Sequence, residues 1–276
     1  MPAASLAGLI DLALAEDVGS GDVTTQAIVP ADVQGTAEIV VREAGVVCGL
    51  EVALEVVRRL DPAASMEVLV PDGAAIHDPP GVAARLTGSL AALLTAERTL
   101  LNLMQRMSGI ATATRRYAEA IEGTGVELLD TRKTAPGMRA LDKYAVACGG
   151  GCNHRAGLFD AVLIKDNHVA AAGGIAAAIR AVRARHPQLP VEVEVDTLEQ
   201  LEQALGEEAD TILLDNMEIA TLREAVRRAA GRARLEASGG ITLQTLRDVA
   251  ETGVDAISAG ALTHSVRALD VALEVT

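Results

Sequence analysis

The N-terminal part of the chain combines one helical pattern with short runs in which apolar and polar residues alternate. Apolar residues recur at helical spacing from Ser5 to Glu16, which predicts an amphipathic helix. The segments TAEIVVREAGVVCG and MEVLV alternate with a period of two, as strands do. An Ala- and Leu-rich stretch follows from Leu90 to about Glu122, and because Ser108 and Gly109 interrupt it, we expect two helices there. The first part therefore reads as a small α+β domain.

From residue 126 the chain changes to short β-branched runs, most of them followed by a helical pattern. This alternation is the βα repeat of a parallel barrel. The runs are VELLD at 126, GGCNH at 150, AVLIK at 161, VEVEV at 191, TILLD at 211, RLEAS at 234 and AISAG at 256. These runs fall short of the eight strands in about 250 residues of a full barrel. We therefore predict an open, incomplete α/β barrel of about seven strands.

The composition disfavours several classes of function. A net charge of −14 argues against nucleic-acid and anionic-membrane partners, because both need an extended basic surface. With two tyrosines, one phenylalanine and no tryptophan, stacking on nucleobases is not expected. No apolar run approaches the roughly 18 residues of a membrane span, and the start of the chain is acidic where an export signal is basic. We expect a cytoplasmic protein.

The cysteines and lysines are rare and unevenly placed. Cys48, Cys148 and Cys152 are an odd number without a disulfide-framework spacing, which favours a reducing compartment. Cys148 and Cys152 could ligate a metal, but no second Cys or His pair accompanies them, so we interpret them as buried thiols. All three lysines, Lys133, Lys143 and Lys165, fall within one stretch of 33 residues. This clustering indicates a need for ammonium groups there, although chance clustering of a rare residue is the alternative.

Polar residues follow most of the predicted strands, at the end of the barrel where active sites lie. A basic set comes first, then acids, and then small residues that expose backbone amides. These positions are Thr131, Arg132, Lys133, His154, Arg155 and Lys165, then Glu194, Asp196, Asp215 and Asn216, then Ser238, Gly239, Gly240, Ser258 and Gly260. A lone Asp at a strand end is usually a helix cap, so the prediction rests on the convergence of all these residues at one rim.

The types of these residues predict a site for a phosphorylated substrate and a second anion. Glycine turns before a helix bind phosphate through their amides, and barrels often hold phosphate at the last two strands. Carboxylates on neighbouring strands, Glu194 and Asp215, suit Mg²⁺ held directly or through water. Arginines bind carboxylates through two hydrogen bonds, whereas lysine supplies a compact charge.

Long motifs in the chain resemble the quinolinate phosphoribosyltransferase family. They are DTRKTAPGMRALDKYAV, GGGCNHRAGLFDAVLIKDNH, VEVEVDT, ILLDN and LEASGGI, and the likeness extends to EDVGSGDVTT and to AERTLLNLMQRMSGIATAT at 96–114. The resemblance implies an N-terminal α/β sandwich domain over 1–108, an open seven-stranded α/β barrel over 109–265, and a last helix over 266–276 that returns to the first domain. Departures at Ala135, Met138 and Cys152 remove no charge.

The resemblance also implies a reaction and a set of residue roles. The family converts quinolinate and phosphoribosyl pyrophosphate, with Mg²⁺, into nicotinate mononucleotide, pyrophosphate and CO₂ in NAD biosynthesis. Arg98 would reach the site of a neighbouring subunit, which implies a homodimer. The catalytic residues would be Lys133, Lys165, Glu194 and Asp215. The quinolinate carboxylates would be surrounded by Arg132, His154, Arg155 and Lys165. The phosphoribosyl donor would be contacted by Lys133 and Lys165, its ribose and metal by Glu194 and Asp215, and the rest of its site would be formed by Thr131, Ser238, Gly239, Gly240, Ser258 and Gly260.

Three other functions are compatible with parts of the pattern. A paralogous phosphoribosyltransferase, of the type encoded with molybdate transporters, would act on another acid, but the intact NHR and KDNH segments count against it. A barrel aldolase would use Lys165 as a Schiff base, which borohydride trapping would reveal. A phosphosugar-binding protein without activity would not need carboxylates facing the phosphate site.

Overall fold

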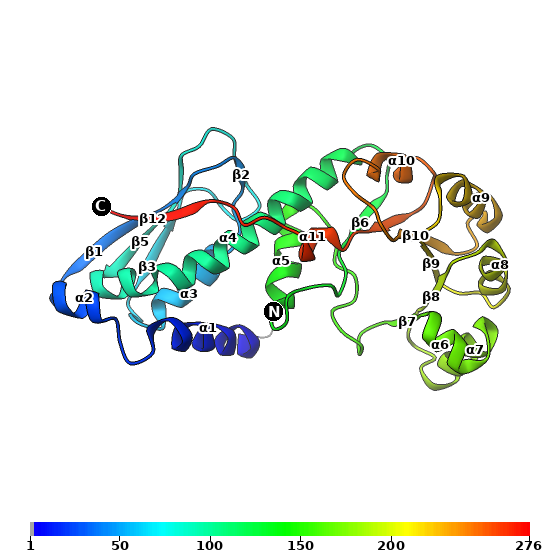
Figure 1. Cartoon of the computed structure of the whole chain (residues 1–276), viewed down its shortest axis with the longest axis horizontal. Coiled ribbons are helices and arrows are strands. Elements are labelled where there is room, and N and C mark those ends of the chain that lie inside the picture. The colour runs from blue at the N-terminus through cyan, green and yellow to red at the C-terminus, as the bar shows by residue number, and fades with distance from the viewer. Residues whose placement is uncertain (1–2) are drawn as a thin grey trace. The chain divides into compact units, whose positions relative to one another are not determined.

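The computed structural model describes residues 3–276 (Figure 1). The chain folds as two compact units, and each collects segments that lie far apart in the sequence. The first unit holds the residues up to 115 together with 135–150 and 265–276. The second unit holds 116–134 and 151–264. Within the described residues, no helix is both long enough and apolar enough to cross a membrane.

A four-stranded antiparallel sheet forms the base of the first unit, with the strand order β12-β1-β5-β3. Its strands are β1 (Gln34–Val41), β3 (Ser65–Val68), β5 (Gly81–Ser89) and β12 (Val271–Val275). Ala37 and Ile39 in β1 are fully buried, so the predicted alternation in TAEIVV is confirmed. A smaller sheet pairs β2 (Gly45–Val46) with β4 (Ala75–Ile76).

Five helices complete the first unit: α1 (Ala3–Val18), α2 (Val23–Ile28), α3 (Leu50–Arg58), most of α4 (Leu90–Ala120) and α5 (Arg139–Gly149). The helix predicted over Ser5–Glu16 is confirmed by α1. The side chain of Asp22 caps α2 by accepting from the amides of Thr24 and Thr25 at 3.1 and 2.9 Å.

The predicted break of the long helix at Ser108 and Gly109 is wrong, because α4 continues through both residues. The Ser108 hydroxyl accepts from the amide of Cys48 at 3.0 Å and donates to its carbonyl oxygen at 3.1 Å. A Cβ atom on Gly109 would overlap the carbonyl oxygen of Arg267. The small residues Ser108 and Gly109 therefore allow other segments to approach the helix closely.

The helix predicted over 266–276 is also wrong, because this segment contains no helix and its residues 271–275 form β12. β12 pairs antiparallel with β1 in a continuous register from Val41–Val271 to Ala37–Val275. The alternating sequence DVALEV buries Val271 and fits an edge strand. The segment thus returns to the first unit by completing its sheet.

The second unit contains a six-stranded parallel sheet in the order β6-β11-β10-β9-β8-β7. No closed barrel forms within the described residues, as predicted for an open α/β barrel. The strands are β6 (Glu127–Leu129), β7 (Val162–Ile164), β8 (Val191–Val195), β9 (Thr211–Asp215), β10 (Arg234–Ser238) and β11 (Ala256–Ser258). The helices are α6 (Asp166–Ala172), α7 (Ile175–Arg185), α8 (Leu198–Gly206), α9 (Ile219–Ala229), α10 (Leu246–Ala250) and α11 (Ala261–His264).

The strand predicted at 150–154 reduces to a single bridge between Cys152 and Leu129. The chain leaves the sheet after this residue because the carboxylate of Asp130 binds the next two positions. It accepts from the Asn153 side chain and from the His154 amide, both at 2.8 Å. Six of the seven predicted strands are therefore found, and the seventh position adds one paired residue.

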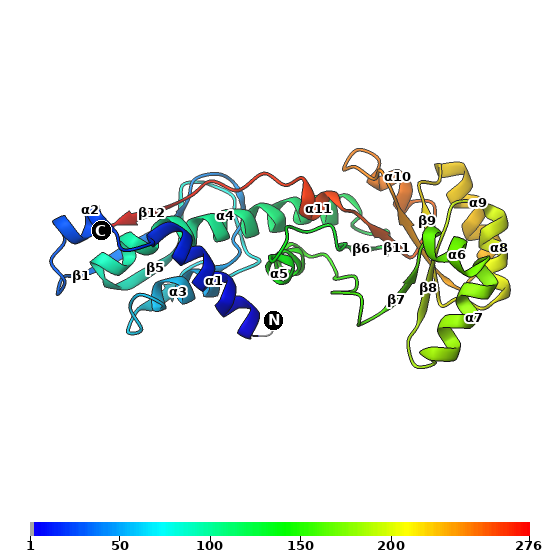
Figure 2. The same cartoon turned by 60° about the horizontal axis from the view of Figure 1, so that its bottom comes forward.

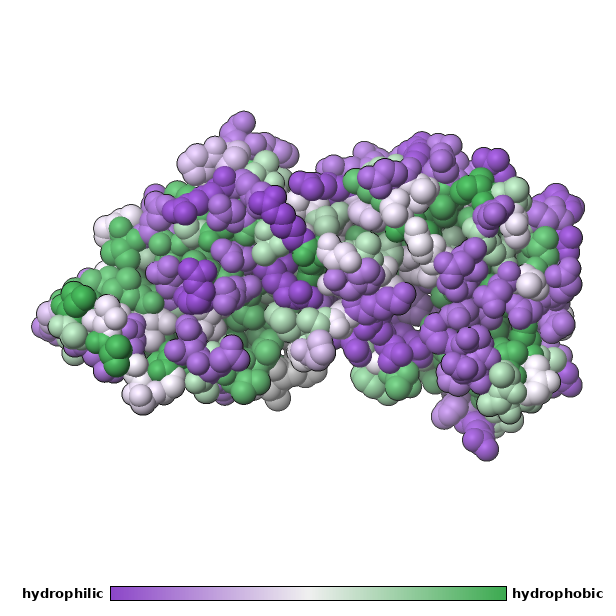
Figure 3. All heavy atoms as spheres, viewed as in Figure 1, coloured by the Kyte–Doolittle hydropathy of each residue, from purple (hydrophilic) through white to green (hydrophobic). Residues whose placement is uncertain are grey.

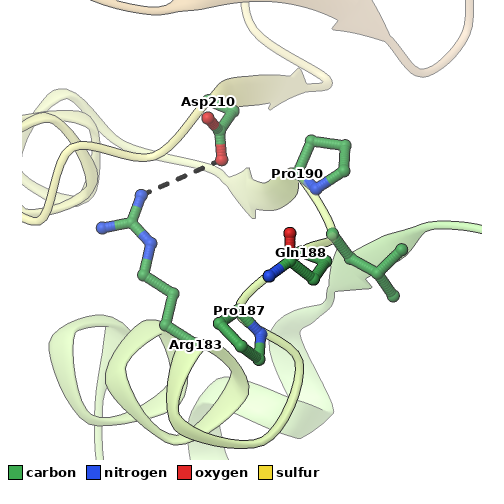
Figure 4. A pocket seen from close by; sticks show the side chains of 6 residues that line it. Arg183, Pro187, Gln188, Pro190 and Asp210 are labelled. Carbon is green, nitrogen blue, oxygen red and sulfur yellow. Dashed lines mark ion pairs between the residues drawn. The ribbon is translucent and has the colours of Figure 1, made fainter.

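The alternation of side chains along the strands separates helix-covered positions from the inner face of the sheet. Val191, Val193 and Val195 are buried, and α7, α8 and α9 run along one face of β8 and β9 (Figure 2). Glu192 and Glu194 therefore point to the opposite face. At the opposite, N-terminal end of the strands, an ion pair connects α7 to the residue before β9. Arg183 lies 3.8 Å from Asp210, beside a proline-rich turn (Figure 4).

Candidate active site

The predicted rim residues lie at or just after the C-terminal ends of the parallel strands or just after the bridge at Cys152, and all of them belong to the second unit. Lys133 and Lys165 both follow parallel strands of this unit. Lys143 instead lies buried in α5 of the first unit, so the lysine cluster of the sequence is divided between the units.

An ion pair joins the ends of β7 and β8. The ammonium of Lys165 donates to the carboxylate of Glu194, one position beyond the paired residues Ile164 and Val193. The Lys165 side chain is 42% exposed, whereas that of Glu194 is only 12% exposed. An anion arriving from solvent therefore meets the ammonium first, while the carboxylate stays behind it.

The ends of β9 and β10 are locked together by a close backbone approach. Asp215 pairs in register with Ser238, and the amide of Asn216 donates to the Ser238 carbonyl oxygen at 2.9 Å. Gly239 and Gly240 have φ values of +93° and +61°, and a Cβ atom on Gly239 would overlap the Asn216 side chain. The predicted phosphate turn thus needs glycine both for its conformation and for the contact.

Lys133 lies against the turn that follows the last strand. Its amide donates to the Thr131 hydroxyl at 3.0 Å, and its carbonyl oxygen accepts from the Thr263 hydroxyl at 2.8 Å. A Cβ atom on Gly260 would lie 3.0 Å from Cδ of Lys133. The structure therefore brings together Lys133 and Gly260, which are predicted to share the phosphoribosyl donor. Ser258 is different: it is buried in β11 and hydrogen-bonds to Glu236.

The charges of two rim arginines, Arg132 and Arg155, interact. Burial and then the charge of Arg132 lower the pKa of Arg155. Arg155 also donates to the carbonyl oxygen of Ala161 at 3.3 Å, which holds it beside the rim. Like charges held together in a partly buried place are stabilised by an anion between them.

His154 points to a buried acidic pair that sequence reasoning missed. Its Nε2 lies 3.0 Å from Glu192 Oε2 and 3.5 Å from Glu236 Oε2. Its Nδ1 accepts from the Arg155 amide at 2.7 Å, which fixes the neutral ring with the proton on Nε2. The hydrogen bond to Glu192 raises the pKa of His154 against the lowering effect of burial. The His154 ring is thus oriented by Glu192 and by the Arg155 amide. Its contact with a substrate carboxylate stays a prediction.

Glu236 is the more perturbed member of this pair. Burial and the neighbouring charge of Glu192 raise its pKa to about 7. Among the described residues, Oε1 of Glu192 and Oε1 of Glu236 have no hydrogen-bond partner. The alternation in VEVEV and RLEAS, with acids between apolar residues, was the signal that could have revealed these inward-facing carboxylates. Asp130 was missed as well, although it directly follows β6, at the same end of the sheet as Asp215 in β9.

Comparison with known proteins settles the family. A model described as the N-terminal domain of quinolinate phosphoribosyl transferase matches residues 22–108, and the model of its C-terminal domain matches residues 110–274. The chain belongs to the quinolinate phosphoribosyltransferase family. The resemblance seen in the sequence motifs is thereby confirmed.

Members of the quinolinate phosphoribosyltransferase family are similar to this chain over both of its units. The nicotinate-nucleotide pyrophosphorylase (carboxylating) of Mycobacterium leprae is 52% identical over 271 residues, which are 95% of this chain and 94% of the relative. The chloroplastic protein of the same name from Arabidopsis thaliana is 44% identical and covers 99% of this chain and 84% of its own length. The structure of the nicotinate-nucleotide pyrophosphorylase from Francisella tularensis superposes with a TM-score of 0.95 at 42% identity, covering 100% of this chain and 98% of that one. The predicted fold class is confirmed by this match.

The carboxylates at the rim suit Mg²⁺ by their chemistry. Glu194 and Asp215 offer carboxylate oxygens, which Mg²⁺ prefers. Among residues 3–276, groups of three metal-type ligands occur at His154–Glu192–Glu236 and at Cys48–Asp72–Cys148, and neither includes Glu194 or Asp215. An ion there would complete its shell with substrate oxygens and water, as Mg²⁺ does at phosphate sites.

Arg98, Cys48 and Cys148 belong to the first unit, whereas Cys152 belongs to the second unit and directly precedes Asn153 and His154. Arg98 is exposed on α4 of the first unit, where it lines a hollow with Asp17, Asp22 and Val23. The interpretation of Cys148 and Cys152 as buried thiols is wrong for Cys152, which is exposed in the second unit, and Cys148 is only half-buried in the first.

Proposed function

We propose that this chain transfers the phosphoribosyl group from phosphoribosyl pyrophosphate to the ring nitrogen of quinolinate. The products would be nicotinate mononucleotide, pyrophosphate and CO₂, a step of NAD biosynthesis. Membership of the family over both domains supports this reaction, as do the names of relatives such as the quinolinate phosphoribosyltransferase (decarboxylating) of Nicotiana tabacum.

The charge interaction between Arg132 and Arg155 is the observation that carries the choice of acceptor. Burial and then the charge of Arg132 lower the pKa of Arg155, and a dicarboxylate bound by both groups would relieve the repulsion between them. A monocarboxylate such as nicotinate supplies half the charge. The rim therefore discriminates by charge as well as by shape.

Charge also explains how the reaction proceeds. When pyrophosphate leaves, C1 of the ribose becomes oxocarbenium-like, and carboxylates such as Glu194 and Asp215 stabilise that positive charge. In the structure Glu194 is neutralised by Lys165. A bound anion competes for the ammonium of Lys165, which leaves the Glu194 carboxylate available to the developing cation.

The acceptor completes the chemistry by itself once it is oriented. Its ring nitrogen attacks C1 and becomes cationic, and this charge stabilises the electron pair left at the adjacent carbon as the 2-carboxylate departs as CO₂. The protein orients the two anions and excludes water, while its basic residues offset their repulsion. No residue needs to act as a general base in this scheme.

Mg²⁺ is part of the proposal. Glu194 and Asp215 would hold it with the donor, directly or through water, and when bound it neutralises the charge of the pyrophosphate leaving group. Lys133, beside Gly260, would add a point charge on the same donor.

We further propose a cytoplasmic homodimer in which Arg98 serves the neighbouring subunit. Val23 is 77% exposed in the hollow that Arg98 lines, and Leu12 and Ile28 are also largely exposed. Apolar surface gathers at the end of the first unit that bears α2 (Figure 3). Such a surface beside an arginine suits contact with a second copy of the chain.

Ultraviolet monitoring of the purified protein tests the reaction. The assay contains phosphoribosyl pyrophosphate, Mg²⁺ and quinolinate, and a parallel run contains nicotinate as the acceptor. We expect nicotinate mononucleotide from quinolinate alone, with stoichiometric CO₂. Donor binding without product from either acid would point to the paralogous transferase with another acceptor.

A further inference from the structure

A second cluster of reactive side chains lies in the first unit and takes no part in the proposed reaction. Cys48, Asp72 and Cys148 bring their side-chain sulfur and oxygen atoms within 4.8 Å of one another. Cys48 directly precedes the N-cap of α3, whereas Cys148 lies in the last turn of α5. The hydroxyl of Tyr144, one turn before Cys148, donates to Asp72 at 2.8 Å. Two cysteines one hundred positions apart thus share one small polar cluster.

The backbone on both sides of the cluster is held in place. Both polar backbone atoms of Cys48 bind the Ser108 hydroxyl, at 3.0 and 3.1 Å. The guanidinium of Arg115 donates to the carbonyl oxygens of Gly149 at 3.0 Å, Cys148 at 3.4 Å and Gly73 at 3.1 Å. Neither cysteine can move far from the other without breaking these bonds. The thiols are therefore preorganised within a short side-chain movement of a disulfide.

The two thiols differ in exposure and in protonation. Cys48 is fully buried, whereas Cys148 is half-buried. The hydrogen bond from Cys48 lowers the pKa of Cys148, and the same contact, together with burial, raises the pKa of Cys48. The more accessible Cys148 therefore forms a thiolate more readily than Cys48, as the attacking cysteine of a redox pair does.

We propose that Cys48 and Cys148 form a peroxide-sensitive pair that closes reversibly to a disulfide. The Cys148 sulfur attacks hydrogen peroxide, the O–O bond breaks, and Cys148 becomes a sulfenic acid with release of hydroxide. The Cys48 sulfur then displaces the sulfenic hydroxyl, which leaves as water with the Cys48 proton. The pair gives two electrons to the peroxide, and a small dithiol returns them. The disulfide joins the C-terminal turn of α5 to the start of α3.

Mass spectrometry of the full chain tests this proposal. The protein is treated with hydrogen peroxide, denatured, alkylated and digested without reduction. We expect a cross-linked peptide that contains Cys48 and Cys148, a mass lower by about 2 Da for the two hydrogens lost, and recovery of both thiols with dithiothreitol. Free Cys48 and Cys148 after treatment that oxidises the exposed Cys152 would overturn the proposal.

Single variants separate the roles within the pair. C152S is the matched control and should close the disulfide as the parent does, whereas C48S should leave Cys148 as a sulfenic acid that reacts with dimedone. C148S should give neither product. Circular dichroism checks that each variant is folded. A dimedone adduct at Cys152 in place of Cys148 would contradict the assignment.

A competing occupant of the cluster is a thiophilic cation, since two thiolates and a carboxylate can hold Zn²⁺. Incubation with Zn²⁺ alone, followed by alkylation, distinguishes the two. The cluster is a metal site, and the redox proposal is wrong, if two results are found together. Stoichiometric Zn²⁺ would protect both thiols from alkylation, and peroxide would form no cross-link in the metal-free protein. A cross-link that forms in the metal-free protein supports the redox pair.

Discussion

The hydroxyl of Thr263 donates a 2.8 Å hydrogen bond to the backbone carbonyl oxygen of Lys133. Thr263 lies in the short α11 directly after the last parallel strand, so this bond attaches the loop after β6 to the turn at Gly260. The position of Lys133 is therefore set by the backbone, and its exposed side chain is available for a ligand.

Replacing this lysine should weaken donor binding and turnover without unfolding the protein. A charge-assisted contact is worth about 1.5–3 kcal/mol, so K133A should lower kcat/KM for the donor roughly 10- to 100-fold. K133R keeps the charge and should recover part of the loss. Initial rates across donor concentrations measure the effect, and a thermal melt checks the fold. A fall in melting temperature like that of a core deletion would show that Lys133 is structural.

Glu194 should contribute to turnover more than to binding, because the charge that it stabilises develops only in the transition state. We expect E194Q to reduce kcat about 100-fold or more, with smaller changes in KM. E199Q, an exposed glutamate in the first turn of α8, is the matched control and should behave like the parent. A rise in KM with unchanged kcat would assign Glu194 to ground-state binding instead.

The buried acidic pair below His154 should make stability depend on pH. The pKa of Glu236 is raised to about 7 from its ordinary value of 4.5, so the folded state keeps a proton that the unfolded state loses. The free energy of unfolding should therefore fall as the pH rises from about 4.5 to about 7, and then level off. The E236Q variant lacks this titrating carboxyl group, so its free energy of unfolding should fall less over this pH range. Thermal melts of both proteins from about pH 5 to about pH 8 measure this, and parallel curves would rule out a raised pKa.

Gly109 should be intolerant of a side chain, although it lies inside a helix. A Cβ atom there would overlap the Arg267 carbonyl oxygen and lie 3.2 Å from Cα of Ala268. We expect G109A to destabilise the protein by about 1–3 kcal/mol, as overpacking does. The control is G8A in α1, where no atom lies within 4 Å and helix propensity predicts a gain of up to about 1 kcal/mol. Equal effects in chemical denaturation would show that the contact with Arg267 is unimportant.

Subunit complementation can test whether Arg98 acts on the neighbouring site. As pure proteins, R98A and K133A should each keep at most about a tenth of the parental activity. In a mixed dimer, one site would lack both residues and the other would be intact. Equal mixing after reversible dissociation should therefore restore about one quarter of the parental activity, since half of the dimers are mixed and each has one working site. No recovery, with mixed dimers demonstrated by tagged subunits, would place Arg98 in the site of its own chain.

Local patterns predicted those parts of the fold in which one periodicity dominates. The parallel strands at 161, 191, 211, 234 and 256 follow from β-branched runs, and the rim follows from the polar residues at their ends. The run at 150–154 failed as a strand because its pairing is cut short by the Asp130 carboxylate, a contact that no local pattern contains.

The other errors have the same origin in contacts between distant segments. Ser108 and Gly109 are typical of helix breaks, but here they admit Cys48 and Arg267 to the helix surface. The C-terminal segment was assigned to a helix on the strength of the resemblance, whereas its own alternation fits the strand that pairs with β1. Glu192 and Glu236 were overlooked because reading only the residues after each strand ignores the inward face within it.

The pairing of β12 with β1 has a consequence for the order in which the protein can fold as it leaves the ribosome. β1 is made within the first 41 residues, but its partner along one edge is not complete until residue 275 has been added. The parallel sheet between them has all its strands by residue 258. Domains generally fold in the order of synthesis. Here the first unit, although most of it is synthesised first, can complete its sheet only after β12 has been made. Nascent chains arrested before residue 271 should accordingly show protease resistance in the second unit before the first.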